Sequence, residues 1–191
     1  SYRRAVTDTL TAGARAEAQA NGIYALGADA AWQAGMAGIV NAQVAAGGDS
    51  SGTGFLAGLG LEHSGDRLSA FAQTQYVSRT FVQSGMADLP YKPRQRTFTG
   101  LGFDFGRHGN MQVAYGLQSY YDSTTVQTFG LSYSLNIGAL GHLGLFASHS
   151  IAGEQNTSLL LNWTLALGDR RTVSASLQQS SGANGGFVAA T

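Results

Sequence analysis

Cysteine is absent from this 191-residue chain, and charged residues and proline are scarce. Without cysteine there is no disulfide framework, no thiolate nucleophile and no cysteine-ligated metal site. Charged residues make up 12% of the chain, about half of the ~25% usual in soluble domains. The 11 basic and 11 acidic residues cancel, so the basic stripe of a nucleic-acid-binding protein is not expected.

Long apolar runs are also missing. No run of about 18 apolar residues occurs, which excludes a transmembrane helix. The chain begins with serine and shows no signal peptide, so we expect a mature chain or an internal fragment. Glycine, in contrast, is frequent (27 residues), and hydrophobic residues make up an ordinary 43%. This composition suits a barrel whose outside meets lipid and whose inside is wet but mostly uncharged.

Alternation of side chains is the strongest signal in the sequence. In Gln155–Gly168, large apolar residues occupy every second position and small polar residues lie between them, with Leu160 as the exception. Successive side chains of a strand point to opposite faces, so one face is apolar and the other polar. Similar segments of about ten residues recur along the chain, as in a transmembrane β-barrel. The eleven predicted strands are Thr9–Ala20, Gly22–Trp32, Met36–Ala46, Thr53–Glu62, Arg67–Arg79, Gln95–Phe105, Asn110–Asp122, Thr124–Asn136, Ala139–Ser150, Gln155–Gly168 and Arg171–Gln179.

Two further segments, Tyr2–Val6 and Phe187–Ala190, are predicted to belong to a preceding and a following strand, which gives 11–13 strands. Every second connection is predicted to be a tight glycine turn, and the alternate ones are more varied. Outer-membrane barrels have short periplasmic turns and longer outer loops, so this alternation assigns a side to each connection. The tight turns are Gln33–Gly35, Ser64–Asp66, Gly106–Gly109, Gly138 and Gly168–Asp169, and the longest loop is Thr80–Arg94.

Several aromatic residues fall near predicted strand ends, where they are expected to form girdles at the membrane–water interface. These are Trp32, Tyr76, Phe81, Tyr91, Phe105, Tyr120 and Tyr121.

Four stretches resemble outer-membrane ushers of the chaperone–usher pilus pathway. YRRAVTDTLTAGARAEA is similar to a strand–turn–strand unit of these proteins, in which the second strand carries an inward glutamate. YALGADAAWQAGMAGIVNAQVA, FLAGLGLEHSGDRLSAFAQTQYVSRTF and FGLSYSLNIGALGHLGLFASHS resemble successive hairpins of the family. The resemblance spans nearly the whole chain.

The resemblance implies an all-β, antiparallel, up-and-down transmembrane β-barrel that is part of a larger usher barrel. Residues 1–191 would be a single fragment of the channel, without the plug and without the periplasmic domains. The implied function is secretion and assembly of pilus subunits across the bacterial outer membrane, with a periplasmic chaperone as a further partner of the full-length protein. No enzyme activity and no cofactor are implied. Because open sheet edges are not viable in lipid, missing strands or self-association would have to close the sheet.

Parity divides the candidate site residues into two sets. The set predicted to line the lumen is Arg15, Glu17, Gln19, Asp29, Gln73, Gln75, Asp104, Gln112, Gln118, Ser132, Ser134, Asn162 and Thr164. Arg15, Glu17 and Asp29 are candidates for a small ionic network across the first hairpin. The set predicted to face lipid is Leu131, Leu159, Leu161, Trp163, Leu165 and Leu167.

Three other functions are compatible with parts of this pattern. A small general-diffusion porin would need a constriction loop, and only Thr80–Arg94 is long enough to fold inward. An outer-membrane lipid hydrolase would need a paired serine and histidine. The adjacent Ser148 and His149 point to opposite faces of a strand and cannot pair directly. A soluble β-sandwich adhesin would need a more charged outer face than this sequence provides. The four histidines show no metal-ligand spacing.

Overall fold

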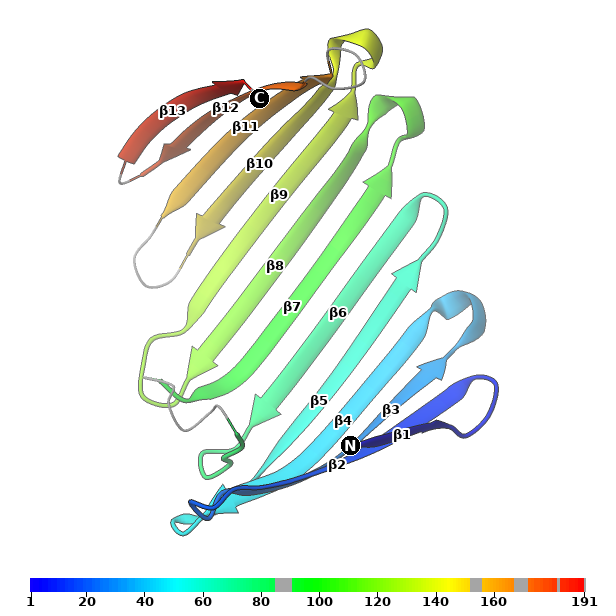
Figure 1. The fold of residues 1–191 in the computed structure, drawn as a ribbon, viewed down its shortest axis with the longest axis vertical. Coiled ribbons are helices and arrows are strands. Elements are labelled where there is room, and N and C mark those ends of the chain that lie inside the picture. Colours follow the sequence, from blue (N-terminus) through cyan, green and yellow to red (C-terminus); the bar gives the residue numbers. More distant parts are fainter. Residues whose placement is uncertain (85–90, 152–155, 167–171, 182, 191) are drawn as a thin grey trace. The chain divides into compact units, whose positions relative to one another are not determined.

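The computed structural model describes residues 1–84, 91–151, 156–166 and 172–181, together with the backbone of 183–190. In this part of the chain thirteen strands follow one another in sequence order, from β1 to β13 (Figure 1). The strands are β1 (Tyr2–Ala5), β2 (Leu10–Ala18), β3 (Tyr24–Gln33), β4 (Ile39–Asp49), β5 (Gly52–Ser64), β6 (Leu68–Val77), β7 (Pro93–Asp104), β8 (Asn110–Tyr120), β9 (Val126–Asn136), β10 (His142–Ser150), β11 (Thr157–Ala166), β12 (Thr172–Ser180) and β13 (Ala183–Ala190).

Sequence neighbours pair antiparallel from β1 to β5 and from β9 to β13. The all-β, up-and-down architecture expected from the alternating sequence is therefore confirmed. Within the described residues no helix has the length and apolar character needed to cross a membrane.

The chain divides into two compact units. The N-terminal unit comprises Ser1–Ser64, Ala70–Thr99 and Leu117–Thr125, and the C-terminal unit comprises Gly65–Ser69, Gly100–Gly116 and Val126–Thr191. Strands β1–β5 lie in the first unit and β9–β13 in the second.

Three connections share one turn built on the sequence G-x-x-G. Short 3-10 helices form at Gly35–Ala37, Gly106–His108 and Gly138–Leu140 (Figure 1, short coiled ribbons). The first and last glycine of each turn have positive φ, where a side chain is strained. The last glycine also lies against the neighbouring strand, because a Cβ on Gly38 would be 2.0 Å from the carbonyl oxygen of Glu62.

This turn corrects two predicted boundaries. Strands were expected to begin at Met36 and Ala139, but both residues lie in 3-10 turns, and β4 and β10 begin three residues later. Met36 and Ala139 each lie four residues before an apolar strand residue, Val40 and Leu143, so they share its parity and alternation alone does not separate turn from strand. The predicted turn Gly168–Asp169 lies outside the described residues.

Little of the apolar surface is buried inside the protein. In the described part of the chain the buried apolar residues are Ile23, Ala25, Leu56, Val77 and Phe81. Large apolar side chains along the strands stay exposed instead, among them Leu26 (63%) and Leu59 (57%). The one hydrophobic cluster lies where Phe81 meets β5 and β6, beneath the segment that follows β6.

Candidate functional site

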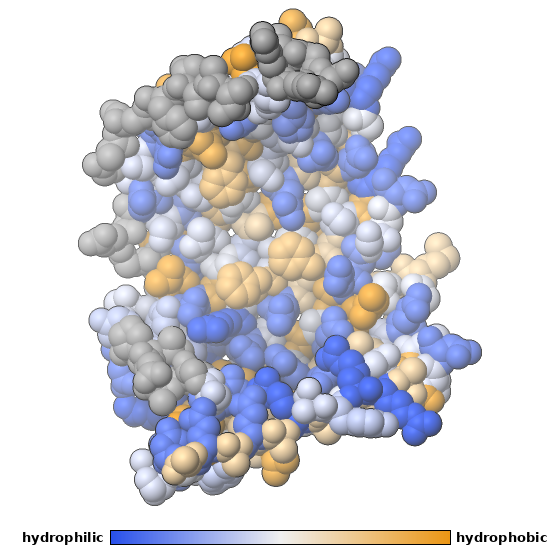
Figure 2. Space-filling view, in the orientation of Figure 1, coloured by the Kyte–Doolittle hydropathy of each residue, from blue (hydrophilic) through white to orange (hydrophobic). Residues whose placement is uncertain are grey.

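A polar face runs across β2–β6 of the N-terminal unit. The strand register places Gly13 opposite Asp29, Asp29 opposite Gln43, and Gln43 opposite Gly58. Cross-strand partners share a face, so these residues line one side of the sheet. We call this side the polar face. Hydrophilic side chains gather in the lower half of Figure 2, over strands of this unit, with hydrophobic groups between and below them.

The predicted lumen residues of this unit lie on the polar face. Arg15 pairs with Gly27 and Glu17 with Ala25, on the same side of β2 as Gly13. Gln73 of β6 approaches Gly60, whose Cβ would lie 3.9 Å from the Gln73 Cγ atom. Gln75 shares the parity of Gln73 and lines a groove of about 330 Å³ together with Arg15 and Asp29.

The ionic network expected across the first hairpin divides into two separate pairs. Arg15 bonds Glu17 on its own strand at 3.4 Å, whereas Asp29 accepts a hydrogen bond from Arg3 of β1 at 2.6 Å. The reason is Gly13, which lies between Arg3 and Asp29 in the register. A Cβ there would be 2.6 Å from the Asp29 Oδ1 atom, so the glycine leaves the space through which Arg3 reaches across β2.

Seven residues after β6, Ser78–Ser84, turn back over the polar face, and we call them the strap. At its start, the Ser78 amide donates to the Phe55 carbonyl oxygen, and the Phe55 amide donates to the Ser78 hydroxyl, at 2.8 and 2.7 Å. The Thr80 hydroxyl donates to the Thr53 carbonyl oxygen at 2.8 Å. These three bonds fix the start of the strap to β5.

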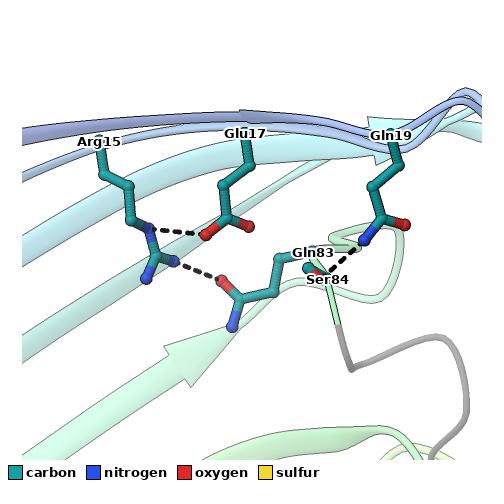
Figure 3. Close-up of polar contacts among 5 residues, drawn as sticks. All are labelled: Arg15, Glu17, Gln19, Gln83 and Ser84. Carbon is teal, nitrogen blue, oxygen red and sulfur yellow. Dashed lines mark hydrogen bonds and ion pairs between the residues drawn. The ribbon is translucent and has the colours of Figure 1, made fainter. Parts of the chain in front are cut away.

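The far end of the strap contacts β2. Figure 3 shows Arg15, Glu17 and Gln19 extending from the β2 hairpin toward Gln83 and Ser84. The Arg15 guanidinium donates to the Gln83 side-chain oxygen at 3.1 Å, and the Gln19 amide donates to the Ser84 hydroxyl at 2.7 Å. All four side chains are in solvent contact.

Phe81 corrects one part of the aromatic prediction. It was expected in a girdle at a strand end, but it is fully buried against Leu56 and Val77. Leu56 lies on the polar face, opposite Ala45, and the sequence analysis did not single it out. The sequence did contain a signal, because Leu56 is a large apolar residue on an otherwise polar parity. Leu56 is apolar because the strap covers this part of the face.

The other aromatic residues do lie at strand ends. Tyr76 packs against Phe55, and Tyr91 packs edge-to-face against Tyr120 with ring centroids 6.1 Å apart. The Tyr121 hydroxyl donates to the Val77 carbonyl oxygen at 2.9 Å. Burial, and then the neighbouring Tyr76 hydroxyl, raise the pKa of Tyr121. Their role as a membrane girdle stays a prediction.

An ion pair ties this aromatic group to the start of the strap. The Arg79 guanidinium bonds the Asp122 carboxylate at 2.8 Å and lies 5.8 Å from the centroid of the Tyr121 ring. Both ionic side chains are largely exposed, so the pair positions the connections and adds little stability.

In the C-terminal unit the predicted lipid-facing residues share one face. Leu131 and Leu159 both pair with Ala147, Leu161 pairs with Leu145, and Trp163 with Leu143. Leu165 continues the parity of β11, and Leu167 lies outside the described residues. The Trp163 indole N–H donates to the Leu140 carbonyl oxygen at 2.7 Å, which orients the ring toward the turn.

The opposite face of this unit carries the predicted lumen residues. Asn162 pairs with Gly144, which pairs with Ser134, and the Ser134 hydroxyl bonds Asn110 at 2.8 Å. Gln112 shares the parity of Asn110 on β8, as does Gln118, which belongs to the N-terminal unit. Ser132 and Thr164 also lie on this side of β9 and β11. The structure thus groups the residues as their parity predicted, and which face is wet stays a prediction.

Asp104 at the end of β7 has a local structural task. One of its carboxylate oxygens accepts a hydrogen bond from the Gly106 amide at 2.6 Å, which supports the start of the second G-x-x-G turn.

The Ser148–His149 pair that was considered for a hydrolase does not form. In β10, Ser148 pairs with Ser158 and His149 with Thr157, so the two side chains belong to opposite faces. The His149 Nδ1 atom lies 2.8 Å from the Thr157 hydroxyl. Across the residues that the structure describes, no three histidine, aspartate or glutamate side chains gather as metal ligands do.

Comparison with known proteins shows a fold and no closer relationship. No family model matches the chain, and no curated protein matches it. Among solved structures, the chain is similar to the translocation pore of the P pilus usher PapC, with a TM-score of 0.67 and 19% sequence identity. The match covers 94% of this chain and 40% of that chain. The chain therefore has the fold of part of an usher barrel, and it spans less than half the length of the pore that it matches.

Proposed function

We propose that this chain forms part of the wall of an outer-membrane channel of the usher type, through which pilus subunits are secreted. The observation that carries the proposal is a sheet with one exposed apolar face and one polar face. Exposed apolar residues follow one another on one face of a strand, as Phe55 (53%), Leu59 (57%) and Leu61 (44%) do on β5. Contiguous apolar surface of this extent needs a partner, and a lipid bilayer suits a β-sheet whose other face is polar.

The polar face suits passage of a folded protein. Its side chains are mainly small or neutral polar groups, and four of its charges form the ion pairs Arg3–Asp29 and Arg15–Glu17, while Glu62 lies farther along the same face. Neutral polar groups stay hydrated and offer a passing surface few strong contacts. The similarity to the PapC pore supports the same proposal.

The partners follow from this proposal. Pilus subunits, delivered by a periplasmic chaperone to the full-length protein, would be the cargo. Membrane lipid would cover the apolar face in the bacterial outer membrane. Backbone groups at a sheet edge must be paired in lipid, so β1 and β13, at the two ends of the strand order, require further strands or a second copy. No nucleic-acid partner is proposed.

Planar-bilayer conductance of the refolded chain, measured beside circular dichroism, tests the proposal. We expect discrete conductance steps with a β spectrum, and reversible blockade when a chaperone-bound pilus subunit is added to one side. A β spectrum without conductance would contradict closure of the sheet by further copies of this chain, and would leave further strands of a longer chain as the means of closure. A detergent-independent soluble monomer would contradict the membrane placement itself.

A small general-diffusion pore is the second candidate, and the strap favours it. Thr80–Ser84, the first part of the predicted constriction loop Thr80–Arg94, bends over the polar face as a constriction loop would. Conductance that admits small sugars freely and does not respond to a pilus subunit would support this alternative over the usher-type channel.

A further inference from the structure

The strap is fixed very differently at its two ends. Its residues cross the sheet in sequence order: Ser78 and Thr80 bond β5, and Val82 lies over Gly47 of β4. Gln83 then bonds Arg15 of β2, and Ser84 bonds Gln19, which directly follows β2. Three strand spacings separate β5 from β2, about 14 Å. Three residues of chain reach about 10 Å, and the long side chains of Arg15, Gln19 and Gln83 cover the remainder.

The base of the strap, Ser78–Val82, is built into the sheet. Phe81 is fully buried, and the strap backbone lies so close to β5 that a Cβ on Gly54 would be 2.1 Å from the Phe81 amide nitrogen. A Cβ on Gly47 would be 2.6 Å from the Val82 carbonyl oxygen. Two glycines at the facing positions of β4 and β5 therefore make the seat for the base.

The tip of the strap, Gln83–Ser84, has no such seat among the described residues. It is held by the bonds to Arg15 and Gln19, which are exposed to solvent. Arg15 also pairs with Glu17, so a second partner competes for its guanidinium. Exposed hydrogen bonds exchange with water at small net cost, whereas removal of Phe81 from its site exposes a whole aromatic ring.

We propose that the strap is a hinged constriction: its base stays docked on β5 while its tip leaves β2 and widens the path over the polar face. This inference rests on the proposed channel function for its consequence, but the hinge itself is a property of the fold. The tip would open and close during passage, and the base would hold the strap at its place.

Amide-resolved hydrogen exchange tests the hinge whether or not the chain conducts. In the refolded wild-type chain, the Ser78 and Phe81 amides, which donate to Phe55 and Ser78 carbonyl oxygens, should be protected. In the double variant Gln19→Ala/Gln83→Ala, the Ser78 and Phe81 amides should stay within about twofold of wild type, and a nitroxide label on Ser84→Cys should become more mobile than in the chain that keeps Gln19 and Gln83. Gln75→Ala removes an amide from the same groove and is the matched control; it should change neither.

Faster exchange at the base together with greater mobility of the label in the double variant would overturn the hinge, because the strap would then detach as one piece. Unchanged mobility of the label at residue 84 would also overturn it, because the two side-chain bonds would not hold the tip.

Conductance tests the consequence. The chain lacks cysteine, so Gln19→Cys/Ser84→Cys can be joined specifically by a short bis-maleimide. We expect one low conductance level when the tip is joined to β2 and an additional higher level in Gln19→Ala/Gln83→Ala. Identical levels in both would show that the tip does not set the width. If no channel forms but the base stays protected while the tip is released, the proposed function is contradicted and the hinge still stands.

Discussion

The polar faces of the two units follow the same alternation, and each contains an apolar residue at a position where the alternation calls for a polar one. The two faces differ in whether that residue is covered. In the N-terminal unit, Leu56 interrupts the polar parity and is 7% exposed, because the strap places Phe81 on it. In the C-terminal unit, Phe146 interrupts the same kind of parity and is 44% exposed, with Leu160 as its cross-strand neighbour. One interruption marks a covered site, and the other leaves an exposed phenylalanine beside a half-buried leucine.

The glycines around the two positions explain the difference. The strands beside Leu56 carry Gly47 and Gly54, where any side chain would collide with the strap. Near Phe146, a Cβ on Gly144 would meet its nearest neighbours at an ordinary contact distance of 4.0 Å. An out-of-phase apolar residue therefore indicates a docked segment only when the surrounding positions also leave room for a backbone.

Truncation of Phe81 and of Phe146 should give the largest difference in effect between the two units. Phe81→Ala removes a fully buried ring, at a typical cost of about 3–5 kcal/mol. We expect the loss to be confined to the strap, with the Phe81 amide exchanging about 100-fold faster. Phe146→Ala removes an exposed ring and should change exchange in β10 less than about threefold. Equal effects would contradict the claim that only the first is covered.

The G-x-x-G turns should respond alike in both units, which limits the contrast to the polar faces. Gly38→Ala and Gly141→Ala each place a Cβ about 2 Å from a carbonyl oxygen of the adjacent strand, at positive φ. Each should destabilise its own unit by about 2–3 kcal/mol. Denaturant unfolding in detergent measures this, with variants that keep only Trp32 or only Trp163 reporting on one unit each. A loss in only one unit would show that the turns are not equivalent.

The glycine that seats the strap has a direct counterpart in the other unit. Gly54→Ala should displace the strap from β5 and cost about 1–3 kcal/mol of docking free energy, read as faster exchange of the Ser78 amide. Gly144→Ala should be neutral or slightly stabilising, because the methyl group fits at an ordinary contact distance from Asn162. Retained protection of Ser78 in Gly54→Ala would contradict the close approach of strap and strand.

The smallest expected effect concerns the Arg3–Asp29 ion pair, which spans β2. Asp29→Asn removes the charge that Arg3 pairs with, but both side chains are substantially exposed. We expect a loss of about 0.2–1 kcal/mol in the unfolding reported by Trp32, and no change in that reported by Trp163. The difference should fade at high salt, since exposed pairs are screened. A larger, salt-independent loss would indicate a buried role for the pair.

Alternation predicted the strands, their antiparallel order and the division of side chains between faces. It did so because the two-residue period of a strand can be recognised within that strand alone, without knowledge of its neighbours. The paired positions of Asp29 and Gln43, or of Asn162 and Gly144, follow from the register that such strands adopt. The usher-like order of hairpins was likewise visible in the sequence and agrees with the fold of the PapC pore.

Long-range contacts were not predictable in the same way. Arg3 reaches Asp29 only because Gly13 lies between them, and this requires three strands in register. The burial of Phe81 depends on a segment that folds back onto a strand already formed, with no local periodicity to indicate it. The proline-containing loop suggested an inward fold, but not the residues that would anchor it.

Cysteine accessibility at two adjacent residues of β11 tests the central claim most directly. Asn162 and Leu161 are neighbours on one strand with opposite faces, and the chain carries no other cysteine to interfere. In outer membranes, a water-soluble maleimide should label Asn162→Cys readily and leave Leu161→Cys unlabelled. Labelling of Leu161→Cys, alone or together with Asn162→Cys, would contradict a sheet that stands with one face in lipid and the other along a water-filled channel.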